Sequence, residues 1–295
     1  MLSIVIPVYN YNIFSLVETL YKQALECTIP FEIICLDDAS HDFTIENQRI
    51  KQFKNVSFTV LEQNIGRSAI RNLLAKKAVY DYLLFLDADV FPTNNQFISN
   101  YVSEIKRNQK VVFGGILYES KKPEKELLLR WIYGREREAL PLSERSKNPS
   151  DFALVSNLLI KKEILLQFPF DKTLTKYGYE DLLFFSVLRS NHIPITHIEN
   201  PVFHLNLETS ALFLNKTRTA LENLAFLNNA NKISINESRI IASFELLKTV
   251  KMLYVFSFIF KLLKSKIERN LVSEKPSLFL FDIYKLGHYS ILKSK

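Results

Sequence analysis

The first ninety residues alternate between short apolar runs and longer stretches with helical spacing. Apolar runs at 3–8, 31–36, 56–61 and 82–86 have the length and the β-branched or aromatic content of buried strands. Between them, apolar side chains recur every three or four residues, which indicates helices. Strands that alternate with helices in this way predict a mostly parallel sheet flanked by helices, the α/β class. The predicted helices cover residues 13–26, 42–53 and 68–79.

Beyond residue 95 the pattern is less regular. The charged stretch 121–150 predicts a helix followed by a mobile loop, and from about residue 210 the chain is mostly helical. We therefore expect one domain of residues 1–210, with halves that meet near residue 95 (1–95 and 96–210), and a helical, basic C-terminal extension of residues 211–295. The other elements predicted in this part are helices at 96–108, 162–168 and 181–190, and strands at 111–118, 152–161 and 193–198.

The positive charge is concentrated in the C-terminal extension. The net charge is +7, and residues 246–295 hold ten Lys or Arg against three Asp or Glu. Residues 1–245 hold 28 of each sign, so a uniformly basic nucleic-acid-binding domain is disfavoured and no nucleic acid partner is expected. Two cysteines without a CxxC spacing, and a start that does not read as a signal peptide, favour a reducing, cytoplasmic location.

Polar clusters follow three of the predicted strands directly. They are Tyr9-Asn10, Asp37-Asp38 and Asp87-Ala88-Asp89. Because ligands of parallel α/β sheets bind at the carboxyl ends of the strands, we expect a binding site at this edge.

The carboxylates of Asp87 and Asp89 are the sharpest chemical signal. Oxygen ligands of this kind suit Mg²⁺ or Mn²⁺ bridging a diphosphate. His204, after a predicted strand, is a candidate third ligand through a neutral imidazole. The alternatives are that the two aspartates cap a turn and that the histidine is structural.

Two further groups can serve a nucleotide or an acceptor, and each has a structural alternative. Asp38 can accept hydrogen bonds from a base or a ribose, or it can belong to an ordinary helix cap. Arg67 and Arg71 can clamp phosphate or lie on a solvated helix face. Glu180 and Asp181 can supply a general base for an acceptor hydroxyl, or they can cap the helix predicted at 181–190.

The order of these motifs along one chain resembles that of family 2 glycosyltransferases over residues 1–210. The motifs that carry the resemblance are Ser3-Ile4-Val5-Ile6-Pro7-Val8-Tyr9-Asn10, Leu36-Asp37-Asp38-Ala39-Ser40, Asn64-Ile65-Gly66 with Arg71-Asn72, Phe85-Leu86-Asp87-Ala88-Asp89 and Gly178-Tyr179-Glu180-Asp181.

This resemblance implies a Rossmann-like fold of the GT-A type, a nucleotide-sugar donor with UDP as the default nucleotide, Mn²⁺ or Mg²⁺ as cofactor, and a glycan or lipid-linked acceptor. It implies that Asp181 is the catalytic base with Glu180 beside it, and that Asp89 binds the metal, with His204 as a looser match. The nucleotide-sugar-binding residues that it implies are Pro7, Tyr9, Asp38, Gly66, Arg67, Arg71 and Asp87.

The implied reaction is a single inverting displacement without a covalent enzyme intermediate. Ala39 and Ile70 stand where family members often have Gly and Ala, but neither carries a predicted role. A QxxRW motif of processive synthases is absent from the sequence, which favours single sugar addition. The alternatives are a non-catalytic carbohydrate-binding or scaffold protein on this fold and a nucleotidyltransferase, whose usual Gly-rich phosphate loop the N-terminus lacks.

The segment 244–267 combines apolar residues with flanking lysines. Its uncharged core, residues 252–260, is too short to span a bilayer. An interfacial helix on an anionic membrane fits this pattern, and packing on the domain or on a second subunit is the alternative. Oligomeric state cannot be read from the sequence.

Overall fold

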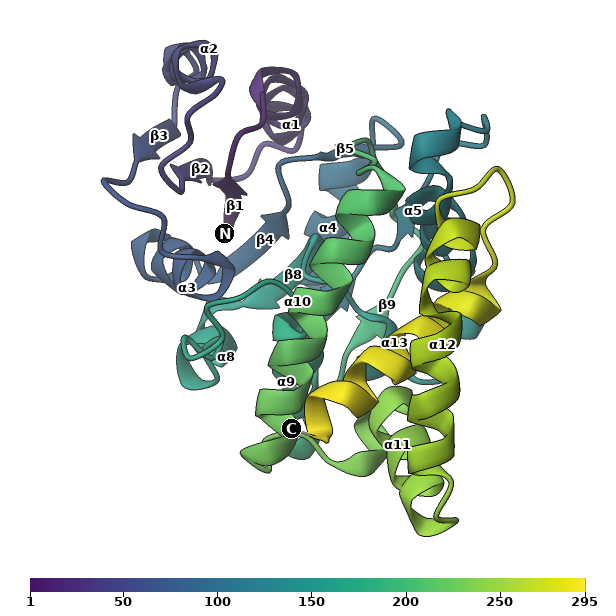
Figure 1. The fold of residues 1–295 in the computed structure, drawn as a ribbon. Helices are drawn as coiled ribbons and strands as arrows, with labels where there is room; N and C mark the ends of the chain where they lie inside the picture. Colours follow the sequence, from purple (N-terminus) through teal and green to yellow (C-terminus); the bar gives the residue numbers. More distant parts are fainter. Residues whose placement is uncertain (295) are drawn as a thin grey trace. The chain divides into compact units, whose positions relative to one another are not determined.

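Four parallel strands form one half of a seven-stranded sheet in the computed structural model, which describes residues 1–294 (Figure 1). They are β1 (Leu2–Val8), β2 (Phe31–Asp37), β3 (Val56–Val60) and β4 (Tyr82–Leu86). The apolar side chains of β1, β2 and β4 are almost entirely buried, as expected for strands covered on both faces, whereas Val60 of the edge strand β3 is 37% exposed. The sheet order β3-β2-β1-β4 brings the polar residues that follow β1, β2 and β4 to one edge.

In the other half of the sheet one strand runs opposite to the rest. Strand β8 (Asn157–Lys161) is antiparallel to both β4 and β6 (Val111–Phe113), and β6 is parallel to β9 (Thr196–His197), so that β6 and β9 have the same direction as β1–β4. The full order is β3-β2-β1-β4-β8-β6-β9. The predicted α/β class with a mostly parallel, Rossmann-like sheet of the GT-A type is confirmed.

Helices flank this sheet because each presents an apolar stripe to it. In α1, for example, Leu16, Val17 and Leu20 recur at helical spacing and are buried. These helices, with the sheets, belong to a first structural unit of residues 1–119, 139–175 and 187–206. Its helices are α1 (Phe14–Glu26), α2 (Thr44–Gln48), the 3₁₀ turn η1 (Arg49–Gln52), α3 (Arg67–Lys77), α4 (Phe97–Lys106), α6 (Leu142–Arg145), α7 (Pro149–Phe152) and α8 (Lys162–Gln167).

A second, three-stranded sheet was not predicted. It has the order β5-β10-β7, with β5 (Val90–Pro92), β10 (Val202–His204) and β7 (Ile116–Leu117). The single strand predicted at 111–118 is wrong, because the chain leaves the large sheet at Gly114 and Gly115. A Cβ on Gly114 would lie 2.3 Å from the Tyr101 hydroxyl, and Gly115 has a φ of +99°. Only glycine fits both demands.

The predicted mobile loop within 121–150 is helical instead. It contains α6 and α7, and Arg145 at the end of α6 is only 2% exposed. Its guanidinium donates hydrogen bonds to the carbonyl oxygens of Gly114 (3.2 Å) and Ile198 (2.6 Å). A buried arginine that satisfies strand-end carbonyls fixes this part of the chain to the sheet.

The second unit is helical and comprises residues 120–138, 176–186 and 207–295. Its core joins Phe213, Phe260, Leu271 and Phe281 from three different helices. The helical C-terminal region is therefore confirmed, whereas the domain boundary near residue 210 stays a prediction. The helices are η2 (Lys125–Leu127), α5 (Leu128–Tyr133), the π-helical η3 (Gly134–Glu138), α9 (Glu180–Ser190, whose first turns lie here), α10 (Ser210–Asn229), η4 (Ile235–Glu237), α11 (Arg239–Thr249), α12 (Leu253–Leu271) and α13 (Leu278–Lys293).

Candidate active site

Asp87 directly follows the buried strand β4 and is paired with a buried arginine. Arg71 from α3 is 2% exposed, donates to Asp87 Oδ1 at 3.2 Å and lies over the Phe170 ring at 5.4 Å. Burial alone raises the pKa of the Asp87 carboxyl, but the charges of Arg71 and Arg67 outweigh it and lower the pKa. Asp87 is therefore held as a carboxylate at the carboxyl end of β4.

Asp89 and His204 are brought together by strands too short to be seen in the sequence. In the β5–β10 ladder His204 lies opposite Val90, and the Leu205 amide donates to the Asp89 carbonyl at 2.9 Å. His204 Nε2 is 3.6 Å from Asp89 Oδ2. Tyr118 stacks on the imidazole, with ring centroids 5.3 Å apart. Two residues 115 positions apart in the sequence thus face each other at the acidic loop, residues 87–89 between β4 and β5.

A divalent metal shared with a diphosphate fits this pair. Among residues 1–294 there is no group of three or more His, Cys, Asp or Glu arranged to hold a metal on its own. However, His204 Nε2 and Asp89 Oδ2 face each other 3.6 Å apart, so the imidazole nitrogen and the carboxylate oxygen could both reach one cation. Mg²⁺ and Mn²⁺ sites in nucleotide enzymes commonly use one or two protein ligands and complete their shell with phosphate oxygens and water. Burial raises the pKa of Asp89, and the charge of Asp87 adds to this rise, whereas His204 opposes it. A bound cation would stabilise the charged form of this carboxylate.

Asp38 shapes the loop that precedes α3. Its Oδ1 accepts from the Ile65 amide at 2.7 Å and its Oδ2 from the Gly66 amide at 3.0 Å. Gly66 has a φ of +81°, which lets the chain turn into α3. Burial raises the pKa of Asp38, and these two hydrogen bonds oppose the rise. The predicted contact of Asp38 with a nucleobase would thus have to use the remaining lone pairs of these oxygens.

The loops after β1 and β2 are tied together by Asn10. The Asn10 side-chain oxygen accepts a hydrogen bond from the His41 backbone amide at 2.8 Å, and the Asn10 backbone amide donates one to Ser40 Oγ at 2.8 Å. This arrangement leaves the Tyr9 ring 52% exposed, next to the half-buried Pro7. An exposed aromatic ring beside strand ends can stack on a flat base. Arg67, also exposed, begins α3.

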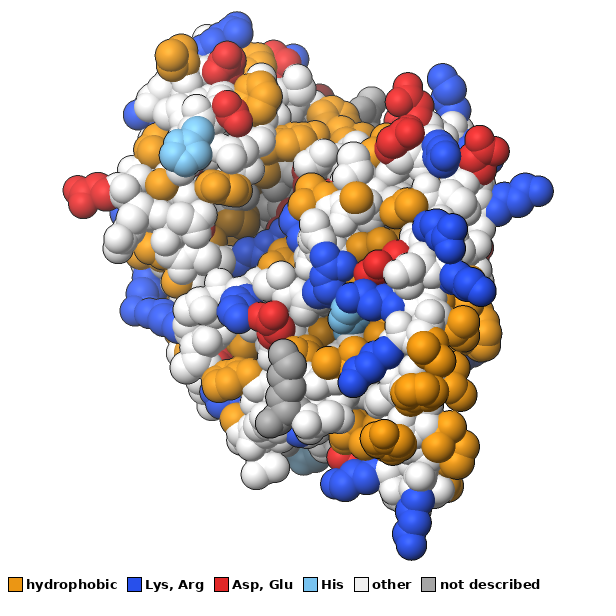
Figure 2. Space-filling view, viewed as in Figure 1, with side chains coloured by type: hydrophobic (Ala, Val, Ile, Leu, Met, Phe, Trp, Pro, Cys, Tyr) orange, Lys and Arg blue, Asp and Glu red, His pale blue; other side chains and the backbone are white. Residues whose placement is uncertain are grey.

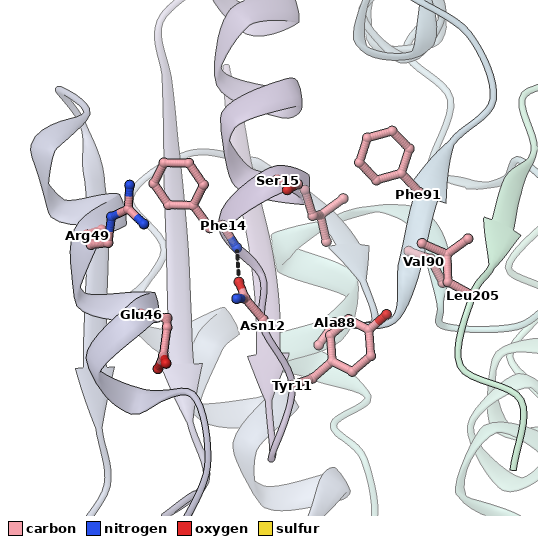
Figure 3. A pocket seen from close by; sticks show the side chains of 11 residues that line it. Tyr11, Asn12, Phe14, Ser15, Glu46, Arg49, Ala88, Val90, Phe91 and Leu205 are labelled. Atoms are coloured by element: carbon pink, nitrogen blue, oxygen red, sulfur yellow. Dashed lines mark hydrogen bonds between the residues drawn. The ribbon is translucent and has the colours of Figure 1, made fainter.

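A pocket of about 370 Å³ borders the acidic loop on the side of α1 (Figure 3). The rings of Tyr11, Phe14 and Phe91 contribute aromatic walls, and Ala88 belongs to the acidic loop itself. Burial, with the charge of Asp89, raises the pKa of the Tyr11 hydroxyl. Polar Asn12, Ser15, Glu46 and Arg49 also line the pocket. Aromatic walls with few polar groups suit a ring-shaped ligand such as a sugar or a base.

Glu180 and Asp181 lie in the first turn of α9, in the second unit. Glu180 is 7% exposed and Asp181 is partly exposed. The preceding residues Gly178 and Tyr179 both have positive φ, +96° and +68°. Asn223 from α10 donates to the Lys176 and Gly178 carbonyls, at 2.8 Å each, and holds this turn in place.

Gly178→Ala should disturb the position of the two carboxylates. The new Cβ would lie 2.5 Å from the Ala220 Cβ, at a φ that side chains disfavour, and we expect a cost of about 1–3 kcal/mol in free energy of unfolding. Denaturant unfolding measures this loss. Adding Ala220→Gly removes the contact but not the backbone strain, so the double variant should recover part of the lost free energy of unfolding. If Gly178→Ala alone were as stable as the wild type, the turn would not be constrained as described.

Arg71→Met should remove the buried cation that is paired with the Asp87 carboxylate and destabilise the fold. Removing one partner of a buried ion pair costs about 3–5 kcal/mol, and we expect the lower end because Asp87 is 25% exposed. The matched control is Arg137→Met, because the side chains of Arg137 and its partner Asp282 are 41% and 48% exposed and the loss of such a pair should cost about 1 kcal/mol or less. Equal losses for the two variants would contradict a structural role for the Arg71–Asp87 pair.

Tyr11, Tyr118 and Asn223 were not identified from the sequence. Tyr118 follows β7, which pairs with β10, so its place next to His204 follows from a register that no sequence pattern announces. Tyr11 could have been identified from the sequence, since it directly follows the polar cluster Tyr9-Asn10.

Comparisons with known proteins identify the family of this chain. The family model described as "Glycosyl transferase family 2" matches residues 3–174. The poly(ribitol-phosphate) beta-glucosyltransferase of Bacillus spizizenii is 30% identical over 217 residues, which are 70% of this chain and 29% of that protein. An uncharacterized glycosyltransferase of Haemophilus influenzae is 35% identical over 102 residues, 32% of this chain and 39% of that protein. The chain thus spans well under half the length of these relatives.

Two solved structures share the fold. Residues 1–349 of TarS from S. aureus, in complex with UDP, align with a TM-score of 0.54 and 18% identity, over 99% of this chain and 90% of that chain. The mannosyltransferase PcManGT from Pyrobaculum calidifontis, in complex with GDP-Man and Mn²⁺, aligns with a TM-score of 0.60 and 12% identity, over 100% and 88%. At these identities the likeness shows the fold alone.

Proposed function

We propose that this chain, which belongs to glycosyl transferase family 2, moves a sugar from a nucleotide-sugar donor to a hydroxyl group of a glycan or lipid-linked acceptor. The observation that carries the proposal is the acidic loop at the end of β4. There the Asp87 carboxylate is paired with Arg71, and two positions later Asp89 faces His204 in a pair suited to a metal. Carboxylates and an imidazole at the carboxyl edge of an α/β sheet suit a bound nucleoside diphosphate with its cation.

The proposed nucleotide is UDP. Tyr9 and Pro7 would line the base, Asp38 and the Gly66 turn would position it, and Asp87 would lie near the ribose and diphosphate. UDP is supported by the TarS complex with that nucleotide, whereas the PcManGT complex with GDP-Man supports GDP as the second choice. The printed activity of the Bacillus relative, on poly(ribitol-phosphate), makes a surface polymer a reasonable acceptor class.

Asp89 and His204 would hold Mn²⁺ or Mg²⁺, and the ion would neutralise charge on the departing diphosphate. Arg67 adds a positive charge that reaches both aspartates of the acidic loop. Positive charge placed where negative charge develops on the leaving group stabilises the transition state.

Asp181 would act as the general base. In a single displacement it takes the proton of the acceptor hydroxyl while that oxygen attacks the anomeric carbon. The bond from this carbon to the diphosphate oxygen breaks in the same step, and the anomeric configuration inverts. Glu180, which is more deeply buried, would orient Asp181 or the acceptor.

We further propose that the enzyme works on the cytoplasmic face of an anionic membrane, with residues 244–267 in contact with the lipid. Both cysteines are free thiols, in keeping with a reducing compartment. A lipid-linked acceptor would then be presented at the same surface.

Release of nucleoside diphosphate from a panel of UDP- and GDP-sugars tests the proposal. We expect Mn²⁺-dependent release from one donor, faster when acceptor glycolipid is added. A non-catalytic carbohydrate-binding protein would bind sugar without releasing nucleotide. A nucleotidyltransferase would instead release pyrophosphate from a nucleoside triphosphate and a sugar phosphate.

A further inference from the structure

Helix α12 has two opposite apolar faces, of which only one is covered. Phe260, Ile267 and Leu271 are buried in the helical core against Phe281 and Tyr284 of α13. The other face carries two rows of exposed apolar side chains at a spacing of four residues. These rows are Tyr254, Phe258 and Leu262, and Val255, Ile259 and Leu263.

These six residues are here called the exposed face of α12, and all of them are far more solvent-exposed than core side chains. Tyr254 is 83% exposed, Leu262 65% and Phe258 56%. Figure 2 shows hydrophobic side chains gathered over α12, with Lys and Arg side chains around them. A contiguous apolar patch of this kind marks an interaction surface.

The charge around the patch identifies its partner. Lys251, Lys261 and Lys266 are exposed on or beside α12, and the whole segment 244–267 contains five lysines and one glutamate. Lysines that border an apolar helix face, with aromatic side chains within that face, match an anionic lipid surface. A symmetric contact with a second copy would bring the same lysines together and be opposed by their repulsion.

We propose that the exposed face of α12 inserts into the interfacial region of an anionic membrane while its opposite face stays packed on α13. The two readings that the sequence left open for this segment, membrane contact and packing on the protein, are thus both satisfied by different sides of one helix. Within residues 1–294 the helices are too short or too polar to cross a bilayer, so the contact lies along the surface.

This proposal rests on the membrane contact proposed above. Its test needs no sugar transfer, so its failure can be told apart from a failure of the proposed glycosyltransferase activity. The full chain is sedimented with vesicles of phosphatidylcholine, alone or with roughly one-third phosphatidylglycerol. We expect binding only to the anionic vesicles, reduced at about 0.5 M salt. The variant Tyr254→Ser, Phe258→Ser, Leu262→Ser should bind at least about tenfold more weakly.

A matched control removes three exposed apolar side chains elsewhere: Ile45→Ser, Val79→Ser and Leu166→Ser. It should bind vesicles within about twofold of the wild type, because these residues lie outside α12. Lys251→Gln, Lys261→Gln, Lys266→Gln, which leaves the apolar face intact, should remove most of the preference for anionic lipid.

Three outcomes would overturn the proposal. One is a wild type that does not bind anionic vesicles, and another is an apolar variant that binds them as well as the control does. The third is a wild-type dimer in solution that the apolar variant converts to monomer without any vesicle binding, which would assign the face to a second copy.

Discussion

Asp181→Asn should lower the turnover number for sugar transfer by about 10²–10⁴-fold while leaving donor binding unchanged. The amide cannot take the proton of the acceptor hydroxyl, and loss of a general base costs this much. The residue lies in the first turn of α9 and is partly exposed, so the isosteric change should barely affect folding. Steady-state kinetics with acceptor, together with calorimetric titration of the donor nucleotide, separates the two effects.

Glu163→Gln is the matched control for this prediction. Glu163 is also an acidic residue in the first turn of a helix, α8, and its side chain is 73% exposed. It should share any general effect of removing a carboxylate from a helix N-terminus, worth about 0.3–1 kcal/mol in stability, without loss of turnover. A transfer rate for Asp181→Asn within about threefold of the wild type would exclude Asp181 as the base.

Asp89→Asn should remove most of the metal dependence of the enzyme. An amide oxygen is a weaker ligand than a carboxylate, and we expect the Mn²⁺ concentration for half-maximal turnover to rise by about 10–100-fold. Manganese binding in the presence of UDP, followed by the loss of free Mn²⁺ signal in electron paramagnetic resonance, gives a readout independent of turnover. His204→Ala should act in the same direction, because His204 Nε2 lies 3.6 Å from the same carboxylate.

Asp42→Asn serves as the control for the metal prediction. Asp42 is exposed in the loop after β2 and is not part of the acidic loop, so its loss should leave the apparent metal affinity within about twofold of the wild type. Unchanged Mn²⁺ binding in both Asp89→Asn and His204→Ala would show that the metal, if one is used, is held elsewhere.

The parallel half of the large sheet and its ligand edge could be predicted from sequence because the signals there are local. Strand β4 is five apolar residues followed at once by Asp87-Ala88-Asp89, and β1 and β2 also end in polar clusters. Each run is long enough for its burial to appear as an uninterrupted apolar pattern. Because the carboxyl ends of parallel strands lie at one edge of a sheet, the polar clusters were expected to meet there, although the order β3-β2-β1-β4 itself was not predicted.

The small sheet could not be predicted because its strands are two or three residues long. Periodicity needs a longer segment, so β5, β7 and β10 left no pattern. His204 was expected beside Asp89 only as a candidate metal ligand, and its contact with Tyr118 was missed. The prediction of a mobile loop around Arg145 was wrong for a different reason. A charged side chain in a charged segment suggested a mobile loop, but the guanidinium is buried because it satisfies strand-end carbonyls that are distant in sequence.

The most direct test of a nucleotide-sugar site at the end of β4 is calorimetric titration of the wild-type chain with UDP and with GDP, each with and without Mn²⁺. We predict that one of the two nucleotides, UDP in the first instance, binds and that Mn²⁺ tightens its binding by tenfold or more, about 1.4 kcal/mol. Failure of both nucleotides to bind, with or without the metal, would contradict the assignment of Asp87, Asp89 and His204 to a donor site and would leave a non-catalytic role on this fold as the better explanation.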